Sequence, residues 1–244
     1  MRQFGVVLIV AASVLYLNGC KTDRASKESS TIDSRTSDLA KTDASSTTAP
    51  PRIEPVNNSQ DKRPLIVSFG DSLTAGYGTE AGQTYPDYLQ AELDSRGYKY
   101  RVVNAGISGN TTKDGLERVN NIIAMKPAVV IVEFGGNDGL RGLRIEDTRA
   151  NLDKILQSLK SSGTKIVLAG ITLPPDYGPD YIKQFNATYS LLAQKYHVPM
   201  LPFLLKGVFG VDGMMQPDRT HATASGNKVV AGNLLPFVTP LLTK

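Results

Sequence analysis

The clearest structural signal in the sequence is the segment at residues 65–72, which reads LIVSFGDS. Its first five residues carry no charge and include Ile and Val, and a glycine and two polar residues follow at once. A nearly continuous apolar run of this length is typical of a parallel strand that is buried on both faces. Because glycine permits a tight turn, Gly70 marks the end of the strand, and Asp71 and Ser72 are expected just beyond it.

Four further segments repeat this pattern, at residues 101–104, 128–134, 165–171 and 199–203. Between them lie segments in which apolar residues recur with helical spacing, at residues 85–96, 111–125, 152–159, 185–196 and 222–235, the last continuing to residue 242 past two prolines. Strands that alternate with helices imply right-handed crossovers. We therefore predict an α/β fold over residues 64–244, a three-layer α/β/α sandwich around a five-stranded parallel sheet.

Unusual residues follow the predicted strands at their carboxyl ends, where open α/β sheets bind ligands. The segments are residues 69–76 (FGDSLTAG), 104–111 (NAGISGNT), 134–139 (FGGNDG) and, near the C-terminus, 217–221 (PDRTH). We expect the first and third to be tight glycine-rich loops. The second opens a helix and leaves free N–H groups that point into the crevice.

These segments contain the groups that a covalent hydrolytic reaction needs. A serine hydroxyl is a poor nucleophile until a base takes its proton, and an imidazole oriented by a carboxylate is the base best suited to neutral pH. We interpret Ser72 as the nucleophile, His221 as the base and Asp218 as the residue that orients the imidazole. The N–H groups of Ser72 and Gly109 and the amide of Asn137 would stabilise the oxyanion. They converge only if the first strand lies between the second and third, which predicts the sheet order 2-1-3-4-5.

The four blocks resemble those of the GDSL, or SGNH, hydrolase family, whose Ser, Gly, Asn and His stand here as Ser72, Gly109, Asn137 and His221. The resemblance extends over residues 65–242. It is closest to the bacterial branch called thioesterase I, lysophospholipase L1 or arylesterase, which shares residues 135–142 (GGNDGLRG), 173–178 (LPPDYG) and 198–203 (VPMLPF). It implies a flavodoxin-like fold and hydrolysis of small esters, acyl thioesters or lysophospholipids through an acyl-serine, with no metal or organic cofactor.

Two residues depart from the family pattern, Asn110 where Asp is usual and Ala222 where Pro is usual, and neither removes a catalytic group. Two alternative functions stay open. The first is a carbohydrate O-acetylesterase, because the same family removes acetyl groups from polysaccharides. The second is a non-catalytic envelope lipoprotein, which would predict an eroded triad, whereas every triad and oxyanion position is present.

Other residues near these blocks receive weaker interpretations. We predict a structural hydrogen-bonding role for Asp71 and a surface or loop position for His197, the chain's other histidine. We expect residues 139–144 to form a mobile lip over the site. The turn around Tyr177 either borders the acyl pocket or is a plain surface loop.

The N-terminal residues 1–20 have the features of a secretory signal. Arg2 precedes an apolar run at residues 6–17, which is too short to span a bilayer comfortably. The run ends in LNGC at residues 17–20, which resembles a bacterial lipobox, although Asn18 is unusual there. Because Cys20 is the single cysteine, we predict that it is acylated and becomes the mature N-terminus. The alternative is an ordinary signal peptide or an anchor helix with an incidental cysteine.

Residues 21–63 are rich in Ser, Thr, Asp, Ala and Lys, a composition that predicts a disordered linker. The net charge of the chain is +4, from 27 Lys and Arg against 23 Asp and Glu, which argues against a nucleic-acid partner. We expect a lipid-anchored protein of the bacterial cell envelope, at the outer membrane or cell surface, with a periplasm-facing position open. Its partners would be the membrane and an ester or lipid substrate. The sequence leaves the oligomeric state open, with a monomer as the simplest expectation.

Overall fold

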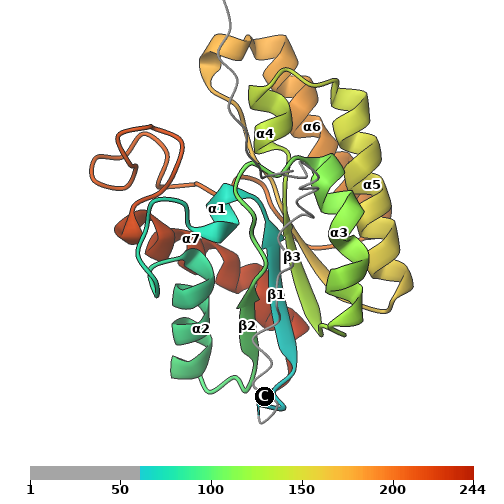
Figure 1. Ribbon diagram of the computed structural model, residues 1–244, viewed down its shortest axis with the longest axis vertical. Coiled ribbons are helices and arrows are strands. Elements are labelled where there is room, and N and C mark those ends of the chain that lie inside the picture. The colour runs from blue at the N-terminus through green and yellow to red at the C-terminus, as the bar shows by residue number, and fades with distance from the viewer. Residues whose placement is uncertain (1–60) are drawn as a thin grey trace, which may run out of the picture. The chain divides into compact units, whose positions relative to one another are not determined.

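The computed structural model describes residues 61–244, so the predicted signal peptide, Cys20 and nearly all of the predicted linker lie outside the described residues. A parallel sheet forms the centre of the fold (Figure 1). Its strands are β1 (Leu65–Gly70), β2 (Arg101–Asn104), β3 (Val129–Glu133), β4 (Lys165–Ala169) and β5 (Met200–Leu201). They lie in the order β2-β1-β3-β4-β5, which confirms the predicted order. In this register Val67 of β1 pairs with Val103 on one side and Val130 on the other.

Helices cover both faces of the sheet. They are α1 (Ser72–Ala75), α2 (Tyr85–Ser95), α3 (Thr112–Ala124), α4 (Gly136–Leu140), α5 (Ile145–Ser161), α6 (Pro179–Tyr196) and α7 (Ala224–Val238), with 3-10 turns at Pro175–Tyr177 and Thr239–Leu241. Helices α2 and α7 pack against each other on one side, and α3, α5 and α6 pack on the other (Figure 1). The predicted three-layer α/β/α sandwich is thereby confirmed.

The core explains why the strands read as continuous apolar runs. In β1, Ile66, Val67 and Phe69 are fully buried, and in β3 every residue from 129 to 133 is buried. Burial of each large aliphatic or aromatic side chain contributes about 1.5–3 kcal/mol to folding. The two central strands therefore provide a rigid base for the loops at their carboxyl ends.

Two helices, α2 and α3, each begin with a capping box formed by a threonine and an aspartate. Thr84 is the N-cap residue just before α2 and Thr111 is that just before α3, each with an aspartate three residues later that accepts a hydrogen bond from the threonine N–H. Such a capping box satisfies backbone donors that a helix start leaves free. The cap at Thr111 fixes where the glycine-containing loop after β2 ends and α3 begins.

The predicted glycine-rich loops after β1 and β3 each contain a short helix that the sequence analysis did not predict. Helix α1 has four residues and α4 has five, too few for an apolar repeat to appear in the sequence. The last helix begins at Ala224, two residues later than expected, because Thr223 caps it through the N–H of Gly226. It continues through Pro236, as predicted, but it ends at Val238 and is followed by the 3-10 turn that contains Pro240. The expected continuation to residue 242 was therefore wrong, because proline has no N–H to extend the helical hydrogen bonding.

The beginning of the described region contacts the folded domain through Arg63. Arg63, the last residue of the predicted linker, donates a hydrogen bond to the Tyr100 carbonyl at 3.3 Å and forms an ion pair with Asp61. Within residues 61–244, every helix is too short or too polar to traverse a lipid bilayer.

Candidate active site

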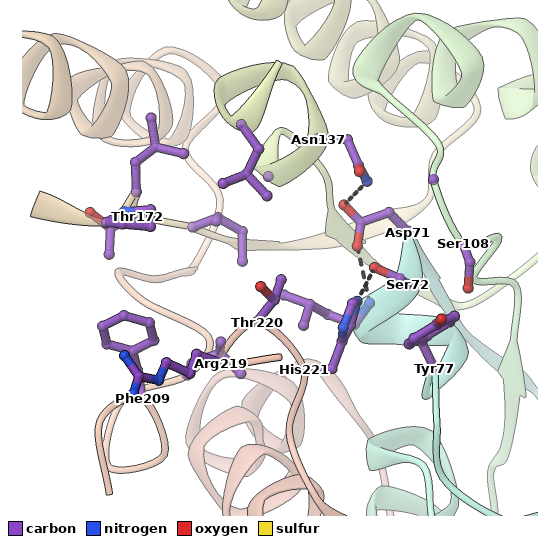
Figure 2. A pocket seen from close by; sticks show the side chains of 18 of the residues that line it. Asp71, Ser72, Tyr77, Ser108, Asn137, Thr172, Phe209, Arg219, Thr220 and His221 are labelled. Carbon is purple, nitrogen blue, oxygen red and sulfur yellow. Dashed lines mark hydrogen bonds between the residues drawn. The ribbon is translucent and has the colours of Figure 1, made fainter. Parts of the chain in front are cut away.

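Three side chains that the sequence singled out form a continuous hydrogen-bonded chain. His221 Nε2 lies 2.8 Å from Ser72 Oγ (Figure 2), and His221 Nδ1 lies 2.7 Å from Asp218 Oδ2. Ser72 and His221 are 149 positions apart in the sequence, so the fold alone brings them together. The arrangement is the one in which an imidazole removes the hydroxyl proton while a carboxylate holds the ring.

The local backbone structure sets the orientation of Ser72 and Asp218 in this hydrogen-bonded triad. Ser72 is the first residue of α1, directly beyond the buried strand β1. Asp218 Oδ1 accepts hydrogen bonds from the N–H groups of Thr220 at 2.9 Å and His221 at 3.0 Å, which leaves Oδ2 for the imidazole. Burial opposes ionisation of Asp218, but the hydrogen bonds from the His221 ring and from the two backbone N–H groups outweigh it and lower the pKa of Asp218. The carboxylate is therefore held ionised.

The other face of the imidazole contacts a residue that the sequence reasoning missed. The ring of Tyr77 lies 4.6 Å from that of His221, measured between centroids. The Gln216 amide donates to the Tyr77 carbonyl at 2.7 Å, and the Gln216 N–H donates to the His221 carbonyl at 2.8 Å. Gln216 thus connects Tyr77, which follows α1, to the loop at residues 217–221 that contains His221. No spacing in the sequence links these residues.

The expected oxyanion donors all border one cavity, which is lined by Ser72, Gly109 and Asn137. The Asn137 amide nitrogen, in the first turn of α4, donates to Asp71 Oδ2 at 3.1 Å (Figure 2) and to the Asn110 carbonyl at 3.0 Å. Gly109 has a φ of 83°, a left-handed conformation that glycine adopts readily. Both Asn137 hydrogens therefore have partners before substrate binds, and a developing oxyanion would compete with them.

A buried pair of carboxyl groups lies directly behind Ser72. Asp71 is 2% exposed, and it accepts hydrogen bonds from Asn137 and from the Leu73 N–H, as predicted for a structural residue. Burial raises the pKa of Asp71 to about 6, against the effect of these hydrogen bonds. Glu133, at the end of β3, accepts from the Thr74 hydroxyl and the Asp71 N–H, and burial, together with the charge of Asp71, raises its pKa well above the usual value.

Arg118 of α3 links two of the loops, the one after β1 and the one after β2. Its guanidinium donates to the carbonyls of Gly70 at 2.7 Å and Ala105 at 2.8 Å, and to Asn110 Oδ1 at 2.8 Å. The same group stacks over the Phe69 ring, 4.4 Å from its centroid. Burial lowers the pKa of Arg118 to about 10. Arg118 therefore binds the side chain of Asn110, one of the two residues that depart from the family pattern. A single arginine in a helical segment did not predict this contact from the sequence.

The cavity beside Ser72 has a volume of about 270 Å³, close to the lower end of the range for small-molecule sites. Beyond the polar groups at Ser72, its walls are largely apolar: Leu140, Ile171, Leu173, Pro174, Phe203, Leu205 and Phe209. Pro174 borders it but Tyr177 does not. The turn around Tyr177 thus contributes to the wall, although the tyrosine itself does not.

The remaining predicted residues have structural positions. Asp138 is 2% exposed and accepts hydrogen bonds from the N–H and hydroxyl of Thr112, which ties α4 to α3. The Tyr177 hydroxyl donates to the Leu140 carbonyl at 2.8 Å, at the start of the predicted lip. His197 is exposed at the end of α6, as expected.

A serine, an imidazole and a carboxylate joined in this way at the carboxyl edge of a parallel sheet define the class of hydrolytic enzymes that attack acyl carbonyls. Comparison with known proteins gives the family. Residues 68–229 match the model of the GDSL-like lipase/acylhydrolase family. The chain therefore belongs to the GDSL-like lipase/acylhydrolase family, as its four sequence blocks indicated.

Relatives and solved structures agree with this assignment. The chain is 43% identical over 178 residues to esterase TesA of Pseudomonas aeruginosa, an alignment that covers 72% of this chain and 89% of the relative. It is 37% identical to thioesterase 1/protease 1/lysophospholipase L1 of Escherichia coli K12, over 72% of this chain and 84% of the relative. A crystal structure of TesA superposes with a TM-score of 0.71 at 42% identity, over 74% of this chain and all of the other.

Proposed function

We propose that this protein is a serine esterase that hydrolyses carboxylic esters, with small aryl and alkyl esters, acyl thioesters and lysophospholipids as its substrate classes. Ser72 is the nucleophile, His221 the general base and Asp218 the residue that orients the imidazole. The observation that carries the proposal is the unbroken chain of contacts from Ser72 Oγ through His221 to Asp218, at 2.8 Å and 2.7 Å. The names of the relatives, among them esterase, thioesterase and arylesterase, support it.

The geometry supports a two-step reaction. His221 Nε2 accepts the Ser72 proton as the oxygen attacks the ester carbonyl, and Asp218 stabilises the imidazolium through Nδ1. The oxyanion receives hydrogen bonds from the N–H groups of Ser72 and Gly109 and from the Asn137 amide. His221 then donates its proton to the leaving oxygen or sulfur, which leaves the acyl group on Ser72. Water, activated by the same imidazole, attacks the acyl-serine and releases the acid.

The shape of the cavity favours acyl-ester hydrolysis over an O-acetylesterase. An acetyl group extends only one methyl beyond the carbonyl carbon, whereas the cavity beside Ser72 is also lined by Ile171, Leu173, Phe203 and Phe209, and Figure 2 shows Phe209 on the side of the cavity away from Ser72. Each methylene that leaves water for such a wall contributes about 0.8 kcal/mol. We therefore expect esters of longer acyl chains to be better substrates than acetates.

A series of p-nitrophenyl esters from acetate to dodecanoate, assayed with the wild type and three variants, tests the proposal. Ser72→Ala and His221→Ala should each lower kcat/KM by several orders of magnitude. His197→Ala is the matched control, since it removes the other histidine from an exposed helix end, and should retain full activity. Activity confined to acetates, with acetylated polysaccharides preferred, would support the O-acetylesterase instead. Equal and negligible rates in all four proteins would support a non-catalytic lipoprotein.

We also propose that the enzyme is held in the bacterial cell envelope by acylation of Cys20. The proposal rests on the lipobox-like LNGC at residues 17–20 and on the polar composition of residues 21–63. Several acyl chains on one cysteine give durable membrane attachment, whereas one chain gives only marginal attachment. The mass of the mature N-terminus tests this, because an unmodified Cys20 or cleavage at another residue would refute it.

A further inference from the structure

One of the two residues between Asp218 and His221, Arg219, has an unusual backbone conformation. Among residues 61–244, the non-glycine residues with positive φ are Lys126, His197 and Arg219. His197 ends α6 and Lys126 follows the end of α3, where left-handed residues are common. Arg219, in contrast, has a φ of 56° within the loop at residues 217–221 that contains His221. Glycine would adopt this conformation without strain, and strain retained at a functional site points to a use for the side chain.

Arg219 lines the same cavity as Ser72. It is the one permanently cationic residue among those that line it, and it is exposed. Within the described part of the chain, no carboxylate lies within salt-bridge distance of its guanidinium, whereas Asp218 beside it is engaged by His221. The cavity therefore carries a positive charge that the described residues do not neutralise.

The position of this charge indicates which part of a substrate it meets. Figure 2 shows Arg219 with Phe209 and Thr172 on the side of the cavity away from Ser72, and Asn137 and Ser108 on the side of the nucleophile. An acyl group bound for attack has its carbonyl at Ser72 and its chain along the apolar wall. The leaving group, in contrast, must lie against His221 to receive its proton. Arg219 thus faces the far end of the acyl chain.

We propose that Arg219 forms an anion subsite that selects acyl groups with a carboxylate at the end remote from the ester, such as half-esters of dicarboxylic acids. The inference rests on the proposed esterase function and adds a substrate class to it. The apolar wall binds the methylenes, and the guanidinium binds the terminal carboxylate with two parallel hydrogen bonds. Arg219 acts by binding and takes no part in the covalent steps.

Matched pairs of substrates test this subsite. Mono-p-nitrophenyl adipate and p-nitrophenyl hexanoate have the same leaving group and six acyl carbons, and differ in a terminal carboxylate in place of a methyl group. The readout is the ratio of kcat/KM for the adipate half-ester to that for the hexanoate, measured in the wild type, Arg219→Gln and Arg219→Lys. A ratio cancels any effect of the substitution that is common to both substrates. Lys206→Gln is the matched control, because Lys206 is an exposed cation outside the cavity lining.

The ratio in the wild type should exceed that in Arg219→Gln by about two- to fivefold, the range for an exposed ion pair. Arg219→Lys should retain part of the preference, and Lys206→Gln should retain all of it. Raising the salt concentration to about 0.5 M should reduce the wild-type ratio, because dissolved ions screen the attraction between partly exposed charges.

Three outcomes would overturn the inference, and they are distinguishable. Equal ratios in the wild type and Arg219→Gln, with both esters hydrolysed, would refute the anion subsite and leave the esterase function intact. Failure of the wild type to hydrolyse either ester would refute the esterase function and the subsite together. A third arm compares hexanoyl esters of glycerol 3-phosphate and of glycerol. If Arg219→Gln changes this ratio and leaves the adipate ratio unchanged, Arg219 faces the leaving group, and the acyl-side placement is wrong.

Discussion

Asn137→Ala tests the link between the oxyanion site and the buried carboxyl groups behind it. In the free protein the Asn137 amide already donates to Asp71 Oδ2 at 3.1 Å and to the Asn110 carbonyl at 3.0 Å. The same amide is the proposed donor to the oxyanion. Truncation should therefore affect two properties at once, the rate of ester hydrolysis and the free energy of unfolding.

The two magnitudes follow from these contacts. Loss of one oxyanion donor lowers kcat by about 10²- to 10³-fold. A hydrogen bond between neutral groups contributes about 0.5–1.5 kcal/mol and one to a charged group about 1.5–3 kcal/mol, so loss of the bonds to Asn110 and Asp71 should cost about 2–4 kcal/mol. The variant should stay folded, because typical domains are stable by about 5–15 kcal/mol.

The loss of stability should also depend on pH. Burial raises the pKa of Asp71 to about 6, and the Asn137 hydrogen bond lowers it. Without Asn137 the folded state holds the Asp71 proton more tightly, so the folded variant is penalised most where Asp71 ionises. Urea unfolding at pH 5 and pH 8 measures this, and the difference between wild type and Asn137→Ala should be larger at pH 8.

Asn151→Ala is the matched control for Asn137→Ala. Its amide donates to the neutral Thr112 hydroxyl at 3.1 Å, so its loss should cost about 1 kcal/mol at both pH values and leave the hydrolysis of p-nitrophenyl esters unchanged. Activity of Asn137→Ala within tenfold of the wild type would refute the oxyanion role. An equal loss of stability at pH 5 and pH 8 would refute the proposed link to Asp71.

Three further predictions concern the carboxyl pair, the packing behind α1 and the membrane anchor. Burial raises the pKa of Glu133 well above its usual value, so the folded wild type loses stability as the pH rises above the usual pKa of a glutamate. Glu133→Gln should remove the part of this loss that Glu133 causes, which urea unfolding at pH 5 and pH 8 would measure. Gly106→Ala should destabilise the fold by about 1–3 kcal/mol in urea unfolding, because its Cβ would overlap the Ala75 backbone nitrogen. Cys20→Ser should abolish radiolabelled palmitate incorporation and move the protein from the membrane to the soluble fraction.

The sheet and the principal site residues could be predicted because each left a local mark on the sequence. The central strands are buried on both faces, so they appear as continuous apolar runs. Ser72, Gly109 and Asn137 each follow such a run, which identifies them as strand-end residues. The order of the strands then followed from chemistry, since an oxyanion site needs β1 between β2 and β3.

The remaining site residues could not be predicted, because their contacts join segments that are distant in sequence. Arg118 meets Gly70 across 48 positions, and Glu133 meets Thr74 across 59. A lone arginine in an amphipathic helix and a lone glutamate at a strand end are more simply interpreted as solvated residues. Tyr77 likewise contacts His221 only in the fold.

The unfavourable features of this fold are concentrated beneath the proposed nucleophile. Of the three buried side-chain atoms with no hydrogen-bond partner among the described residues, Ser68 Oγ is in β1 and Glu133 Oε1 is at the end of β3, where Asp71 is buried beside it, and the third is Arg101 Nε in β2. Such groups cost stability, whereas apolar residues at these positions would not. Natural proteins retain local conflicts of this kind mainly where function requires them. The buried polar layer is therefore best explained as the support that holds Asn137 and the first turn of α1 in place while Ser72 itself faces the cavity.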